Sequence, residues 1–320
     1  MFRNQWRKLD TIVGGPNLVK SIDIPRKDLL REIALRLFVN INITTLGVPI
    51  LYAHAPAKWL KRIEIIADGK DTLKSINMQA LVLKNFFNYS TYPRRTVPTL
   101  ATGDNKFYQT VILPFNLPRA VREIDTLVNT GRLSTFVLQA TFGSASDGFS
   151  TPPTAYTLAN AELEVHIHEA ININVPNEKL NFSVYKEMSI EKEVTQTQSE
   201  FQILLPVGNV YRGFLIEAEV NGNPADNVIN EIQIRSGTTV FYKGKWLSIR
   251  EMNALKHKME TESFVGYAYI DFCPEGRMAD ALDASKLSML EAIFDVTKQT
   301  GVNNIRIYPD ELIIPSLVRG

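Results

Sequence analysis

The sequence contains very little cysteine and no long apolar run, and each shortage excludes a class of protein. Its single cysteine, Cys273, excludes an internal disulfide and any zinc site built from several cysteines. No apolar run approaches the roughly 20 residues that a membrane-spanning helix needs. The sequence therefore predicts neither a disulfide-stabilised secreted fold nor a helical membrane protein.

An excess of one charge is also missing. Lys and Arg together number 35 and Asp and Glu 34, so the formal net charge is +1. This balance gives no global reason to expect nucleic acid as the main partner. Hydrophobic residues make up 45% of the 320 residues, which excludes disorder for most of the chain and leaves room for one large or two ordinary domains.

The chain is instead rich in segments whose apolar residues alternate with period two. Between Ile33 and Ile43 every odd position is apolar, while several even positions are polar. The segments 162–175 and 214–220 alternate in the same way. Shorter candidates are 63–66, 107–115, 136–142, 180–185, 201–205, 232–234, 266–272, 290–296 and 304–308. Many short strands with polar faces predict an all-β, antiparallel architecture.

A few segments change to helical spacing. Apolar residues recur every three or four positions from Leu73 to Phe87 and from Trp246 to Met259. Pro118 opens a predicted helical turn over 119–128, and 278–282 is a weaker candidate. These helices are short and lie between predicted strands.

The two halves of the chain resemble each other in sequence. Residues 22–39 align with 203–220 without gaps at an offset of 181, so that Ile33 corresponds to Phe214. Further matches follow in the same order: 63–65 with 232–234, 73–81 with 247–255, 113–115 with 270–272, 136–142 with 290–296 and 165–167 with 305–307. The order predicts a tandem repeat of a β-sandwich over 21–175 and 176–320, preceded by a basic and aromatic arm over 1–20.

The local sequence of both halves is similar to that of a known protein family. The first half reads IPRKDLLREIALRLFVNI and then KDTLKSINMQALVLKNFF; the second reads LPVGNVYRGFLIEAEV and then GYAYIDFCPEGRMADALDASKLSMLEAIFDV. Over about residues 20–315 the chain resembles the double jelly-roll major capsid proteins of icosahedral bacteriophages with an internal membrane, of the tectivirus and corticovirus kind.

The resemblance implies two tandem eight-stranded jelly rolls with short helices in the loops between strands. It also implies a structural protein, not an enzyme, that forms homotrimers of pseudo-hexagonal outline. The trimers would tile an icosahedral shell around an internal membrane, with neighbouring capsomers and minor capsid or vertex proteins as partners. The expected location is the virion capsid, assembled in the host cytoplasm, without a cofactor and without specific nucleic-acid binding.

The candidate contact with a membrane or the inner capsid surface lies in the first residues: Phe2, Arg3, Trp6, Arg7 and Lys8. At helical spacing Phe2 and Trp6 share a face, with basic residues beside it, which is typical of a segment that lies on anionic lipid. The alternative is a basic tail that binds a neighbouring subunit.

Two other features bear on an enzymatic alternative. The pair His166 and His168 is similar to the HxH of cupins, but no third histidine follows at a useful spacing, so we predict a polar strand face and no metal site. Cys273 has no activating histidine nearby in the sequence and is predicted to be a small, partly buried thiol and not a nucleophile. We predict no catalytic residue. The alternative function is a two-barrel cupin-like enzyme or a carbohydrate-binding β-sandwich module.

Overall fold

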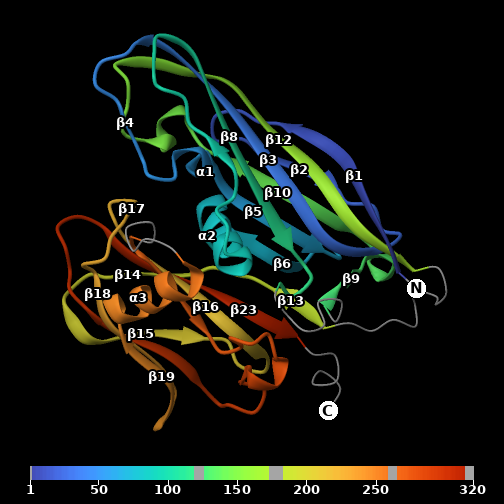
Figure 1. Ribbon diagram of the computed structural model, residues 1–320, viewed down its shortest axis with the longest axis vertical. Coiled ribbons are helices and arrows are strands. Elements are labelled where there is room, and N and C mark those ends of the chain that lie inside the picture. Colours follow the sequence, from blue (N-terminus) through green and yellow to red (C-terminus); the bar gives the residue numbers. More distant parts are fainter. Residues whose placement is uncertain (1, 119–125, 173–182, 259–264, 314–320) are drawn as a thin grey trace. The chain divides into compact units, whose positions relative to one another are not determined.

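The computed structural model describes residues 2–118, 126–172, 183–258 and 265–313 (Figure 1). The chain divides into two compact units. Unit 1 comprises Met1–Pro118 with Arg122–Val184, and unit 2 comprises Tyr185–Gly320 with Arg119–Val121. The predicted boundary between residues 175 and 176 lies outside the described residues.

Unit 1 is built from two antiparallel sheets. The first has the order β1 (Phe2–Val13), β12 (Ala155–Asn172), β3 (Leu29–Thr45), β8 (Gly103–Pro114) and β7 (Arg95–Thr96), with β9 (Val128–Asn129) also paired to β3. The second has the order β2 (Val19–Asp23), β10 (Phe136–Phe142), β5 (Leu60–Ala67) and β6 (Asp71–Ile76). The smaller elements are the pair β4 (Ile50–Leu51) and β11 (Phe149–Thr151), the helices α1 (Ala55–Lys58) and α2 (Met78–Tyr89), and the 3-10 turns Thr130–Arg132 and Ala145–Gly148.

The alternating pattern of β3 explains how unit 1 forms its core. The odd residues from Ile33 to Ile43 are at most 1% exposed, and the strand lies between β12 and β8. Successive side chains of a strand point to opposite faces, so this stripe lies on the inner side of the first sheet, together with buried residues of β8 and β12 such as Val111 and Val165. Trp59 completes the core and packs against Gly148, where a Cβ atom would overlap its ring.

Unit 2 repeats this construction. Its first sheet contains β13 (Val184–Lys186), β14 (Ile190–Glu193), β23 (Asn303–Ile313), β16 (Val210–Val220), β17 (Asn223–Pro224), β20 (Tyr267–Asp271) and β21 (Leu282–Asp283). The second has the order β15 (Gln198–Leu205), β22 (Leu290–Val296), β18 (Ile229–Ser236) and β19 (Thr239–Lys245). Helix α3 (Trp246–His257) and the 3-10 turn Met278–Asp280 lie in the connections. Trp246, Phe214 and Phe294 belong to one continuous core.

The predicted repeat agrees with the strand register. Both units have the same two sheet orders, β1-β12-β3-β8 with β2-β10-β5-β6 in unit 1, and β14-β23-β16-β20 with β15-β22-β18-β19 in unit 2. Ile33 pairs with Leu113, and Phe214, 181 residues later, pairs with Ile270. Each unit is a jelly roll of eight main strands within the described residues, with a helix between the fifth and the sixth. The all-β fold class is confirmed.

Three predicted helices need correction or cannot be followed. The helix expected from Leu73 begins only at Met78, because residues 71–76 form β6 and the Asn77 side chain accepts a hydrogen bond from the Ala80 amide at 2.6 Å. Most of the turn predicted over 119–128 lies outside the described residues. The segment 278–282 forms one 3-10 turn followed by a short strand. The helix from Trp246 is confirmed.

The helix predicted for the first residues is wrong. Phe2–Val13 is strand β1, which pairs antiparallel with β12 from Phe2 opposite Asn172 to Val13 opposite Glu162. A short isolated helix is marginal in water, whereas the edge of β12 offers a row of hydrogen-bonding partners. Among the helices of the described residues, none is long and apolar enough to cross a membrane.

Candidate functional site

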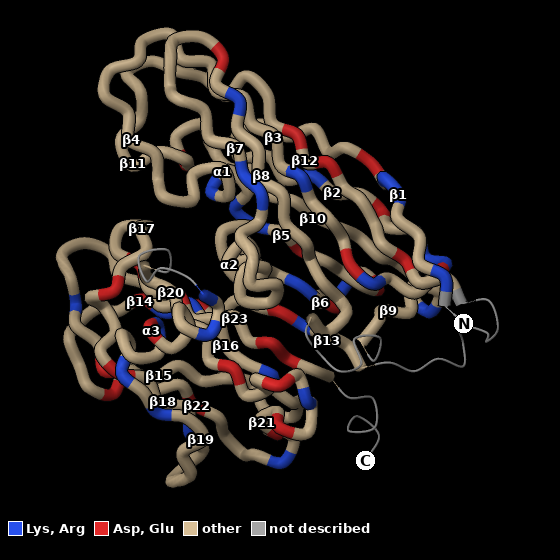
Figure 2. The backbone as a smooth tube through the Cα atoms, viewed as in Figure 1, with Lys and Arg blue, Asp and Glu red and all other residues tan. Residues whose placement is uncertain are grey.

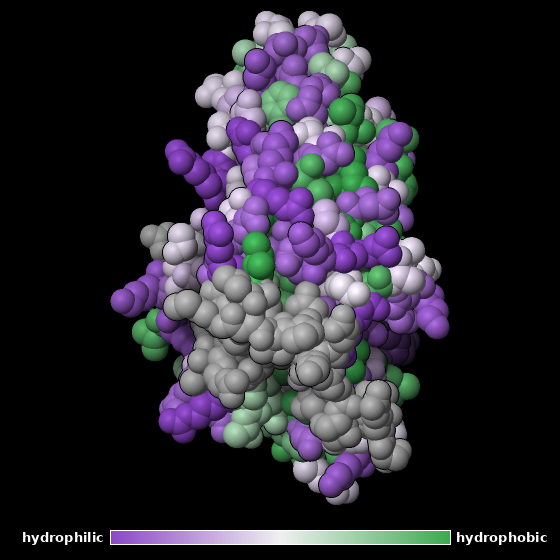
Figure 3. Space-filling model, turned by 90° about the vertical axis from the view of Figure 1, so that its right-hand side faces the viewer, coloured by the Kyte–Doolittle hydropathy of each residue, from purple (hydrophilic) through white to green (hydrophobic). Residues whose placement is uncertain are grey.

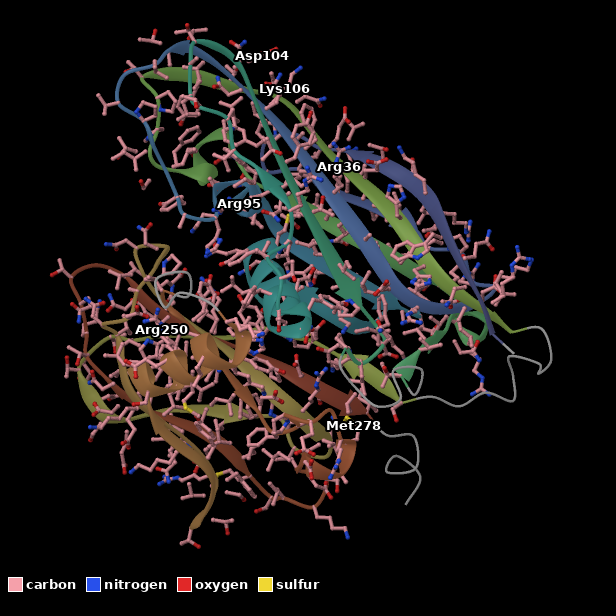
Figure 4. All side chains as sticks on the ribbon, viewed as in Figure 1. Arg36, Arg95, Asp104, Lys106, Arg250 and Met278 are labelled. Atoms are coloured by element: carbon pink, nitrogen blue, oxygen red, sulfur yellow. The ribbon has the colours of Figure 1, made fainter. Side chains whose placement is uncertain are left out.

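The side of the β1-β12-β3-β8 sheet that faces away from the core is called here the outer face of unit 1. Its side chains form rows across the strands. One row joins Thr11, Glu164 and Arg36, and the next joins Glu162, Phe38 and Tyr108. Figure 4 shows Arg36 on β3 with Lys106 and Asp104 further along β8.

These rows surround a hollow of about 270 Å³, called here the groove. Its lining is Lys8, Thr11, Arg36, Phe38, Tyr108, Glu162 and Glu164. The Arg36 guanidinium lies over the Tyr108 ring, 4.8 Å from its centroid, and the Phe38 and Tyr108 rings are 5.0 Å apart. The groove therefore combines an aromatic floor with charged walls.

Glu164 organises the charges of the groove. Its carboxylate lies 3.0 Å from Lys8 Nζ, 3.5 Å from Arg36 Nη1 and 3.3 Å from His166 Nε2. The hydrogen bond from Lys8 lowers the pKa of Glu164. Glu162 accepts a hydrogen bond from the Asn160 amide at 2.8 Å. Exposed pairs of this kind are worth about 0–1 kcal/mol each, so they shape the surface more than they stabilise the fold.

Beyond the groove, Trp6 lies on the same outer face. Its ring stacks on His168 with centroids 4.2 Å apart and remains 51% exposed. His168 is buried, and its Nδ1 lies 3.0 Å from a Glu32 oxygen. An amphipathic indole ring that is half exposed to solvent in this way is suited to contact with a partner.

The predicted contact residues do not act as one cluster. Arg3 is exposed, and Lys8 is engaged with Glu164. The Arg7 Nε atom donates to Glu169, a carboxylate only 2% exposed, at 2.9 Å. The side chain of Phe2 lies outside what the structure describes. Among the described side chains of this set, Arg3, Trp6 and Lys8 are exposed, and Lys8 is 52% exposed although it pairs with Glu164.

The two histidines of the HxH pair contact different carboxylates. His166 faces Glu164 and His168 faces Glu32. Across the described ranges, no group of three or more His, Cys, Asp or Glu side chains is placed to hold a metal ion.

Cys273 is 1% exposed, and burial raises the pKa of its thiol to about 11. A thiol with this pKa is almost entirely protonated near neutral pH. The thiol is therefore more completely buried than the sequence predicts.

Sequence reasoning missed the rest of the groove. Arg36, Phe38 and Tyr108 stand at alternate positions of β3 and β8, where the period-two pattern indicates only that they point away from the core. That they meet Lys8 depends on β1 pairing with β12, which the assumed helix concealed. The apolar residues of this segment stand at positions 2, 6, 9, 12 and 13, so no period of two indicated a strand there.

The outer face of unit 2 is the corresponding side of its β14-β23-β16-β20 sheet. There Tyr267 and Tyr308 donate to the two oxygens of Glu217, at 2.7 and 2.9 Å. Arg306 lies 3.5 Å from Glu217 and also pairs with Glu219 at 2.7 Å. Burial raises the pKa of both tyrosines far above the ordinary value, which keeps them neutral donors.

The same network continues around Asp310. Its carboxylate accepts hydrogen bonds from Tyr185 at 2.9 Å and from Tyr269 at 2.6 Å. Buried polar groups are tolerated when they are hydrogen-bonded, and these partners meet that condition. The network is therefore a packed structural surface.

Figures 2 and 3 show how charged, hydrophilic and hydrophobic residues are distributed. Lys and Arg are interspersed with Asp and Glu along the backbone of both units (Figure 2). Hydrophilic and hydrophobic side chains are mixed over the side of unit 1 that Figure 3 turns toward the viewer. Mixed surfaces of this kind are typical of non-obligate protein interfaces, which are about as apolar as the rest of a protein surface.

Comparison with known proteins gives similarity in structure. No protein-family model and no curated protein matches the sequence. Among solved structures, the chain is similar to the STIV MCP with 16% identity and a TM-score of 0.79, covering 98% of this chain and 97% of that one. It is similar to the major capsid protein P2 from Bacteriophage PM2 with 15% identity and a TM-score of 0.65, covering 98% of both chains.

A third similar structure is the PBCV-1 virus capsid, with 11% identity and a TM-score of 0.63, covering 99% of this chain and 96% of that one. The likeness covers 98–99% of this chain and so spans both units. The chain therefore has the double jelly-roll fold of these viral capsid proteins, as the sequence resemblance predicts.

Proposed function

We propose that the chain is a viral major capsid protein, a structural subunit that assembles with copies of itself into an icosahedral shell. The observation that carries the proposal is the pair of jelly rolls with equivalent register in one chain. The alignment with the STIV MCP, which covers nearly all of both chains, supports it. The two-barrel enzyme is disfavoured because the two histidines of its best motif contact separate carboxylates.

The assembly unit that we propose is a homotrimer. Three copies of two similar rolls supply six similar bodies, which suits a ring of pseudo-hexagonal outline. Closed rotational symmetry limits the surfaces that must be complementary to those between one copy and the next. Neighbouring capsomers and minor capsid or vertex proteins would contact the outside of this ring.

Contact with an internal membrane is assigned to the start of β1. Arg3 offers a positive charge and Trp6 a half-exposed indole, the two groups that favour an anionic lipid surface. The test is flotation with vesicles that contain phosphatidylserine. We expect reduced binding for Arg3→Glu and Trp6→Ala, and unchanged binding for the control Lys243→Glu, whose side chain is 56% exposed in unit 2. Equal binding by all variants would contradict the assignment.

The function itself is tested by electron microscopy of the purified protein and of particles that contain it. We expect class averages with a hexagonal outline, and a virion in which this chain is the most abundant protein. A chain that remains monomeric and is rare in particles would contradict the proposal.

A further inference from the structure

The helix that follows the fifth main strand is buried in unit 1 but partly exposed in unit 2. In α2 of unit 1, eleven of the twelve residues are buried. In α3 of unit 2, Leu247, Met252 and Leu255 are 58%, 67% and 79% exposed. Large apolar side chains that gather on one exposed helix face are a common sign of an interaction surface.

The exposure of the outer sheet faces differs in the opposite direction: the face of unit 1 is the more exposed one. On the outer face of unit 2, the side chains of Glu217 and Arg306 are 2% and 19% exposed. At the equivalent positions of unit 1, Arg36 and Glu164 are 52% and 25% exposed and border the groove. Within the described residues, the outward side of α3 and the outer face of unit 1 are therefore both open to solvent, and the two belong to different units.

We propose that the exposed face of α3 in one copy of this chain docks into the groove of unit 1 in the next copy. This inference rests on the proposed function and names the contact that closes the ring. Because a helix of unit 2 meets a sheet of unit 1, the contact is heterologous, and heterologous contacts form a closed ring when the rotation between copies permits.

The chemistry of the two surfaces is complementary. The groove offers the aromatic rings of Phe38 and Tyr108, which suit the aliphatic Leu255 and Met252 side chains. An amphipathic helix that lays its apolar face in such a hollow is a recurring mode of recognition. A helix of twelve residues is about 18 Å long, enough to follow several rows of a sheet.

Charge supplies the orientation. Glu251 is exposed on α3 between Leu247 and Leu255, one turn from each. The lining of the groove holds two cations, Lys8 and Arg36, and two carboxylates, Glu164, which pairs with both cations, and Glu162. Glu251 would be attracted on the side of Lys8 and Arg36 and repelled by Glu162, and this asymmetry fixes which way the helix lies.

The first test introduces a charge at the apolar contact. Leu255→Asp should weaken association of the trimer by about 30-fold or more, the size of an interface hot spot. The control Val48→Asp alters a side chain that is 83% exposed in a loop of unit 1, and should leave the association unchanged. Sedimentation velocity measures the association, and circular dichroism melts verify that both variants are folded.

The second test exchanges charges. Arg36→Glu and Glu251→Arg should each weaken the trimer about 5- to 10-fold, and the double variant should recover most of the loss. Additive losses without recovery would overturn the pairing. Trimers that persist in Leu255→Asp would overturn the docking surface, whereas a wild-type chain that never forms trimers would instead refute the proposed function.

A third measurement does not depend on destabilising the protein. In a Cys273→Ala background, a preparation of Leu255→Cys is mixed with one of Thr11→Cys, whose residue lines the groove. After exchange and treatment with a short thiol crosslinker, covalent dimers should join the two variants. Products that join only like variants, or no product from folded trimers, would contradict the proposal.

Discussion

In unit 1 the outer face pairs Arg36 of β3 with Glu164 of β12, whereas in unit 2 the equivalent pair is Glu217 of β16 with Arg306 of β23. Both pairs are 3.5 Å apart, but the charges are exchanged between the strands. The first pair is open to solvent and the second is nearly buried. The comparison teaches that one backbone register supports two different surfaces, because the outward positions are free to change while the inward ones must remain apolar.

The inward positions provide the strongest test of that comparison. Ile33→Ala and Phe214→Ala remove equivalent core side chains, each fully buried. We expect a loss of about 2–5 kcal/mol for the first and about 3–5 kcal/mol for the second. Chemical denaturation monitored by circular dichroism measures both. A loss below about 1 kcal/mol at either position would contradict the equivalence of the two cores.

The two outward ion pairs should differ sharply in how much each contributes to the free energy of unfolding. Arg306→Met leaves Glu217, 2% exposed, without its cation and should lower the free energy of unfolding by about 3 kcal/mol. Arg36→Met should change it by no more than about 1 kcal/mol, because its pair is exposed. Urea titrations compare the two variants. Equal losses would show that burial does not separate the faces.

Lowering the pH should reduce the stability of unit 1 through protonation of His54. Burial, aided by Arg95 and Lys58, lowers its pKa from 6.5 to about 4. The unfolded chain then binds a proton that the folded chain does not, so stability is complete above pH 6.5 and falls as the pH drops toward 4. We expect about 3 kcal/mol less stability at pH 4 from this group. The variant His54→Gln should lose that part of the pH dependence in thermal melts; an unchanged slope would be contrary evidence.

The smallest expected difference concerns the helix caps. The side chain of Asn77 caps α2, whereas the N-cap Lys245 of α3 makes no side-chain capping bond. Asn77→Ala should lower stability by about 1 kcal/mol, and Lys245→Ser should raise it by up to about 1 kcal/mol. Thermal melts of the two variants decide the matter, and a destabilised Lys245→Ser would be unexpected.

The repeat could be predicted because it lies in the buried stripe. Ile63 and Ile232 hold the same place in both sheets, opposite Ala140 and Phe294. The match of Val165 with Ile305 was less accurate. Val165 pairs with Leu35, and Ile307 pairs with the equivalent Ile216, so the true partner is two residues further on. A shift of two residues keeps the same face inward, and the apolar pattern therefore does not reveal it.

The outer faces could not be predicted in the same way. The polar positions Glu217 and Glu219 read as a solvent-exposed stripe, yet they are 2% and 6% exposed. Their partners Tyr267, Tyr308 and Arg306 come from strands about 50 to 90 residues further along the chain. A local pattern carries no information on such pairings, which follow only from the complete strand order.

The most direct test of the central claim is the mass of the purified protein in solution by sedimentation equilibrium. A shell subunit of this design is expected to give three times the chain mass of 36.1 kDa, about 108 kDa, over a wide range of concentration. A mass of a single chain at every concentration, from protein that melts cooperatively, would contradict the account.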